Sequence, residues 1–143
     1  MTPIYIGRVE TRLFLLAIIG SLWTLVITPF LPGGGSLSDK YQATFTVLIV
    51  VFLLGILWDI LWQFLQQFRW EKDWPIMYAL FQGIPEGIVA YLVIKAGVPG
   101  DPKITGSAFF IHFTTVWVVT WLFAIGPMRV PFIRWRFRGG RLV

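Results

Sequence analysis

Long apolar runs divide the chain into four segments that are separated by short polar or glycine-rich links. The runs cover residues 13–31, 43–68, 75–94 and 107–126. Each is close to the ~20 residues that an α-helix needs to cross the hydrocarbon core of a bilayer. The pattern therefore predicts an all-α polytopic membrane protein, a bundle of four transmembrane helices in a single domain, followed by a basic cytoplasmic tail at 127–143.

Composition supports a membrane protein and narrows its chemistry. Of the 143 residues, 57% are hydrophobic and only 13% are charged, whereas a soluble domain has about a quarter of its residues charged. The chain has no cysteine and one histidine, His112. A disulfide, a thiolate metal site and a multi-histidine metal site within one chain are therefore excluded. We expect neither a metal nor a cofactor.

Basic residues in the links indicate the orientation. The positive-inside rule assigns the side richer in lysine and arginine to the cytoplasm. We therefore expect both termini in the cytoplasm, in a bacterial plasma (inner) membrane. The richer side carries Arg8, Arg12, Arg69, Lys72 and five tail arginines, and the opposite side carries Lys40, Lys95 and Lys103.

Three ionisable residues, Asp59, Glu86 and His112, lie inside predicted spans. At a rise of about 1.5 Å per residue, all three fall in one layer near the middle of the membrane. Gln63 follows Asp59 by four residues and Gln82 precedes Glu86 by four, so each pair shares a helix face. An unsatisfied polar group in lipid costs several kcal/mol. We expect these faces to point at each other inside the bundle.

The same residues admit a structural and a functional interpretation. Asp59 and Glu86 could form a hydrogen-bonded network that holds helices together, or a proton or cation site. Two buried carboxylates within a few ångströms of each other would not both ionise, which would leave a shared proton. For His112 alone, a histidine satisfied within the core is the favoured interpretation over a ligand.

Pro85 interrupts the third run beside Glu86. Proline cannot donate a hydrogen bond to the carbonyl four residues back, and its ring clashes there. Gly83 and Gly87 on either side make the backbone easier to bend. The sequence predicts a third helix that is either kinked or broken into two halves at Pro85.

The tail alternates arginine with aromatic and aliphatic residues. Because it is short and tethered to the bilayer, the anionic cytoplasmic leaflet is its nearest partner, and we expect no nucleic-acid binding. Docking onto a partner protein is the alternative. The residues expected to contact anionic lipid are Arg129, Arg134, Arg136, Arg138 and Arg141.

The sequence contains no nucleophile–base–acid constellation and no phosphate-binding loop, so we do not expect an enzyme. Two hypotheses remain. The first is a non-catalytic subunit or assembly factor of a larger membrane complex, with other membrane subunits or a second copy of the chain as partners. The second is a small proton- or cation-coupled carrier or channel that uses the carboxylate pair.

Overall fold

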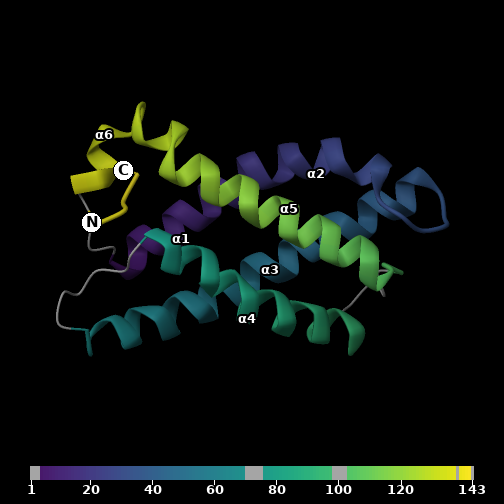
Figure 1. Cartoon of the computed structure of the whole chain (residues 1–143), viewed down its shortest axis with the longest axis horizontal. Coiled ribbons are helices and arrows are strands. Elements are labelled where there is room, and N and C mark those ends of the chain that lie inside the picture. Colours follow the sequence, from purple (N-terminus) through teal and green to yellow (C-terminus); the bar gives the residue numbers. More distant parts are fainter. Residues whose placement is uncertain (1–3, 70–75, 98–102, 138, 143) are drawn as a thin grey trace.

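The computed structural model describes residues 4–69, 76–97, 103–137 and 139–142, and these residues form helices joined by short turns (Figure 1). Within those ranges there is no β-strand. Both termini lie at the same end of the elongated molecule. The elements are α1 (Tyr5–Phe14), η1 (Leu15–Gly20), α2 (Ser21–Ile27), η2 (Thr28–Phe30), α3 (Leu37–Gln66), α4 (Ile76–Lys95), α5 (Gly106–Ile125), η3 (Pro127–Arg129) and α6 (Ile133–Phe137).

Four helical segments are long and apolar enough to cross a membrane, which confirms the predicted all-α class and the predicted four helices of membrane-spanning length. They are Tyr5–Phe30, Leu37–Gln66, Met77–Lys95 and Gly106–Arg129. The first comprises α1, a π-helical stretch (η1), α2 and η2 without an intervening turn.

Side-chain caps fix the start of two of these helices. The Ser36 hydroxyl accepts a hydrogen bond from Asp39 N at 3.2 Å, and the Asp39 carboxylate accepts one from Ser36 N at 3.1 Å. This reciprocal capping box satisfies two backbone donors at the start of α3. Thr105 caps α5 with a single hydrogen bond, which its hydroxyl accepts from Ala108 N at 3.3 Å.

The first helix begins at Tyr5 rather than at Leu13, where the apolar run starts. Arginine and glutamate are good helix formers, so the charged residues between those points do not end the helix. As a result Arg12 lies about 10 Å along the helix from its first residue. The sequence analysis had assigned this arginine to the polar stretch outside the membrane.

Helix α4 runs from Ile76 to Lys95 with Pro85 inside it. It does not divide into two half-helices there, so the broken-helix alternative is wrong. The glycines serve close packing against α5 instead. A Cβ on Gly83 would overlap the Trp117 ring, and one on Gly87 would come within 2.5 Å of the Phe113 ring.

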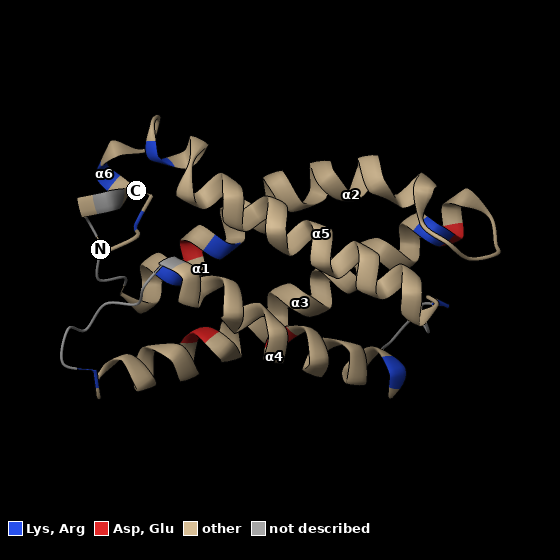
Figure 2. Cartoon of the chain, in the orientation of Figure 1, with Lys and Arg blue, Asp and Glu red and all other residues tan. Residues whose placement is uncertain are grey.

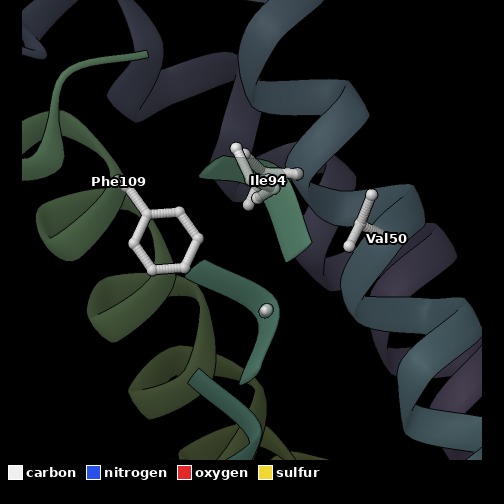
Figure 3. Packing of buried hydrophobic residues seen from close by; sticks show 5 residues of the cluster. Val50, Ile94 and Phe109 are labelled. Carbon is white, nitrogen blue, oxygen red and sulfur yellow. The ribbon is translucent and has the colours of Figure 1, made fainter. Parts of the chain in front are cut away.

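One buried apolar cluster joins α3, α4 and α5. There Val50 of α3, Ile94 of α4 and Phe109 of α5 point at one another (Figure 3). Val47 and Ala90 complete the cluster, and each is only 1% exposed. The charged residues lie mainly at the helix ends, with a few inside α1, α3 and α4 (Figure 2).

The C-terminal residues dock onto α1 of their own chain. Ile4 N donates to the Gly139 carbonyl at 2.9 Å, and the Thr11 hydroxyl donates to the Gly140 carbonyl at 3.0 Å. Leu142 N donates to the Glu10 carboxylate at 2.8 Å. The tail thus makes an intramolecular contact that the sequence analysis did not predict.

The tail arginines differ in how far they reach solvent. Arg134 and Arg141 are exposed, and Arg129 is half-buried. Arg138 lies outside the described residues, as does the side chain of Arg136. Contact of these arginines with anionic lipid stays a prediction.

Substituting Gly7→Ala is expected to release the tail from α1. The added methyl group would overlap the Gly139 carbonyl oxygen and come within 2.7 Å of Gly140 C, and neither backbone group can move while the tail stays docked. Trypsin should then cut the purified protein after Arg141 several-fold faster, because cleavage reports local opening. Gly34→Ala is the matched control, since a methyl there meets nothing within 4 Å. Equal cleavage rates in the two variants would contradict the docking.

Candidate functional site

Three charged side chains from three different helices form one hydrogen-bonded group, which we call the charge triad: Arg12, Asp59 and Glu86. The Arg12 guanidinium donates from Nε and Nη2 to the two oxygens of Asp59, both at 2.9 Å. It donates from Nη1 and Nη2 to the two oxygens of Glu86, at 2.9 and 3.1 Å. The side chains are 18%, 5% and 11% exposed, in the order Arg12, Asp59 and Glu86.

Local sequence makes room for this arrangement. Gly55 lies one turn before Asp59 on α3, and a Cβ at Gly55 would come within 2.6 Å of Arg12 Cζ. Only glycine leaves space there for the guanidinium. The π-helical stretch begins at Leu15, directly after α1, and such widened turns are frequent at functional sites.

The arginine changes the electrostatics expected from the sequence. Asp59 and Glu86 lie close together, as the positions on their helix faces predict. They are bridged by Nη2 of Arg12, which donates a hydrogen bond to each carboxylate. A shared proton is the expectation for two carboxylates that meet without a cation. In the structure they do not meet without one, because Arg12 supplies a positive side chain that bonds to both. Their role as a proton or cation site stays a prediction.

One signal indicates that the carboxylates need a cation. A buried carboxylate without a cationic partner is strongly destabilising, and the four apolar runs contain no lysine or arginine. Cations adjoin three of the runs at once, with Arg12 before the first, Arg69 after the second and Lys95 after the third. Charge balance therefore predicts a cationic partner without identifying Arg12 as that partner.

The charge triad lies in the wall of a cavity of about 1070 Å³. Helix α5 and η3 supply one wall, with four largely apolar residues at four-residue spacing that lead to Arg129. Helix α4 also lines the cavity, with Ala79, Gln82, Gly83 and Glu86. One row of the lining residues of α5, which we call the aromatic stripe, consists of Phe113, Trp117, Trp121 and Ile125.

The other predicted polar residues take different positions. Gln82 is half-buried and lines the cavity beside Glu86. Gln63 is not among the lining residues, and its Oε1 is buried without a hydrogen bond in the described part of the chain. The helix face that carries Asp59 therefore does not continue into the cavity at Gln63.

His112 lines the cavity away from the charge triad. It is 1% exposed, and its Nε2 lies 2.9 Å from the Thr24 hydroxyl. Further along, the Thr28 hydroxyl donates to the Thr24 carbonyl and lies 3.0 Å from the Thr44 hydroxyl. His112 is therefore part of a buried polar contact between α5 and the first helix, at Nε2. Its Nδ1 is buried and has no hydrogen-bond partner among the described residues.

Within the described ranges, no three His, Asp or Glu side chains cluster closely enough to hold a metal ion. The chain matches no protein-family model, no curated protein sequence and no solved structure. Arguments about its function therefore rest on the cavity, the charge triad and the helices around them.

Proposed function

We propose that the protein is a small carrier in a bacterial plasma membrane, with both termini in the cytoplasm, whose central cavity holds a small molecule beside the charge triad. One observation carries the proposal: a cavity of about 1070 Å³ with the charge triad in its wall, within helices long enough to span a membrane. That volume is at the upper end of the range for small-molecule sites, about 300–1,000 Å³. Intramembrane ionisable residues that face a cavity typically mark substrate or proton pathways.

The triad supplies a route for coupling. A proton that reaches Glu86 turns its carboxylate into a neutral carboxyl group, which accepts more weakly from Arg12, because bonds between two charged groups are the stronger kind. A guanidinium N–H of Arg12 then becomes available to a ligand in the cavity, while Asp59 keeps its two bonds. Proton uptake and ligand binding would therefore favour each other.

Helix α4 is suited to a change of shape at this point. Pro85 removes one backbone donor, so the Phe81 carbonyl has no partner from that position. We include the predicted kink at Pro85 in the proposal, as the place where α4 bends when Glu86 leaves Arg12. Sharp bends in helices are most often found at proline.

A pH jump on a supported membrane tests the proposal. A proton that travels from water to Glu86 crosses part of the membrane, so wild-type proteoliposomes should give a transient capacitive current even without net transport. Glu86→Gln should remove most of that current. Glu10→Gln is the matched control, because Glu10 binds the tail and does not line the cavity. A current that is the same in Glu86→Gln as in wild type would contradict the carrier.

The subunit hypothesis remains the second candidate, and one observation favours it. All four oxygens of Asp59 and Glu86 accept bonds from Arg12, as expected if the triad only ties three helices together. Under this hypothesis the native protein is retained stoichiometrically by a larger complex after mild solubilisation. Recovery of the chain alone, with a proton current that depends on Glu86, would reject it.

A further inference from the structure

Arg129 is an arginine in the cavity wall that has no counter-ion among the described residues. It is half-buried, and its Nε is buried with no hydrogen-bond partner in the described part of the chain. The acidic residues that line the cavity, Asp59 and Glu86, are both bonded to Arg12. Glu10, the one acidic residue of α1, accepts a hydrogen bond from Leu142 N. At its Arg129 end the cavity therefore presents a positive charge that no acidic side chain in the described part of the chain balances.

An apolar surface leads away from this cation. The aromatic stripe runs along α5 from Ile125 to Phe113, and its rings bury large apolar areas well. Phe113 and Trp117 contact each other at 6.1 Å between ring centroids, so the stripe is continuous there. A ligand that extends from Arg129 along this wall would have its apolar part against aromatic rings.

The depth of Arg129 fits a charged headgroup. Arg129 is the last residue of the fourth candidate span, Gly106–Arg129, so it lies where the hydrocarbon core meets the polar region. Phe113 lies in the preceding membrane-spanning helix, α5. A molecule with an anionic head and an apolar chain would therefore keep its charge at the boundary and its chain within the hydrocarbon layer.

We infer that the cavity binds an anionic amphiphile, with a phosphate or carboxylate headgroup on Arg129 and its chain along the aromatic stripe. This inference rests on the proposed function and names the ligand class of the same cavity. Guanidinium binds phosphate and carboxylate through charge-assisted, often paired hydrogen bonds. The Arg12 donor that protonated Glu86 releases would offer a second polar contact deeper in the cavity.

Dodecyl phosphate is a suitable probe, and its binding to the purified full-length protein in a neutral detergent can be measured by native mass spectrometry and by titration calorimetry. Arg129→Gln should weaken binding about 10- to 100-fold, as the loss of a charge-assisted contact predicts. Arg134→Gln is the matched control, because Arg134 is an exposed tail arginine that does not line the cavity. It should bind the probe as wild type does.

Two further ligands distinguish the sources of the anion. Inorganic phosphate should compete with dodecyl phosphate weakly, because it lacks a chain for the aromatic stripe; equal competition would show a free-phosphate site and overturn the amphiphile. Dodecanol, which has the chain without the charge, should bind in a manner that does not depend on Arg129. If Arg129→Gln and Arg134→Gln weaken the binding of dodecyl phosphate equally, the probe adsorbs to the protein surface, and the inference is also overturned.

The outcome is separable from that of the proposed function. If dodecyl phosphate binding is unaffected by Arg129→Gln while the Glu86-dependent proton current is present, the amphiphile inference fails and the carrier stands. If binding depends on Arg129 while no proton current is found, the coupled carrier fails and the chain is an amphiphile-binding protein.

Discussion

Arg12→Gln is expected to lower the free energy of unfolding by about 3–5 kcal/mol, the largest single-residue effect in the chain. The substitution leaves two buried carboxylates on α3 and α4 without their cation, and breaking one side of a buried ion pair costs about that much. Reversible unfolding in mixed detergent micelles, followed by tryptophan fluorescence, measures the change. Arg134→Gln, at an exposed position, should change stability by no more than about 0.5 kcal/mol.

A triple substitution separates the loss of charge balance from the loss of packing. Arg12→Met, Asp59→Leu and Glu86→Met together remove all three charges and keep apolar volume in their place. Buried ion groups replaced in this way are often as stable as the original or more so. The triple variant should therefore regain most of the stability lost in Arg12→Gln. If it stays as unstable as Arg12→Gln, the arginine acts through packing, and the account of the triad is wrong.

The same triple variant distinguishes the two candidate functions. A triad that only ties helices together can be replaced by apolar side chains, so a stable triple variant should still assemble with its partners. A triad that exchanges protons with the cavity cannot be replaced, and the transient current on a pH jump should disappear although the protein is folded. If the carrier proposal is right, this variant should therefore keep its stability and lose its proton current.

The sequence pattern predicted the parts of the structure that follow from local rules. Apolar runs of membrane length identified four helices, and four-residue spacing placed Asp59 and Glu86 on inward faces. Helix starts were less accurate, because the first helix continues through charged residues that do not disfavour helix, and Arg12 was therefore missed. The predicted depth in the membrane places His112 in the same layer as the two carboxylates. Depth does not determine the direction in which a helix presents a side chain, because that direction depends on packing. His112 instead contacts Thr24.

The tail and the cavity depend on contacts between distant residues, which a single sequence does not reveal. Gly7 permits close approach of Gly139 and Gly140, more than 130 positions later. The sequence predicts that Gly83 and Gly87 ease bending beside Pro85, and in the structure they instead admit the rings of Trp117 and Phe113. In both cases a glycine marks a position of close contact, but its spacing in the sequence does not reveal which residue it contacts.

If the protein is a carrier, water must be able to enter the cavity beside the charge triad while the helices lie in the membrane. Because the chain has no native cysteine, single cysteines can report on it directly. Gln82 is half-buried and lines the cavity, whereas Ile84, two residues along the same helix, is 52% exposed on the outside of the molecule, where lipid would lie. A thiol reacts as its thiolate, which forms readily in water and poorly in hydrocarbon.

Labelling of these two variants in intact, oriented membranes with a membrane-impermeant thiol reagent is the most direct test. We predict that Gln82→Cys reacts at least about tenfold faster than Ile84→Cys, from the side that carries the two termini. Gly34→Cys, in an exposed turn, is the positive control and should be labelled from its own side of the membrane. If that control is labelled while Gln82→Cys is as unreactive as Ile84→Cys, water does not reach the cavity, and the proposed site does not exist in the membrane.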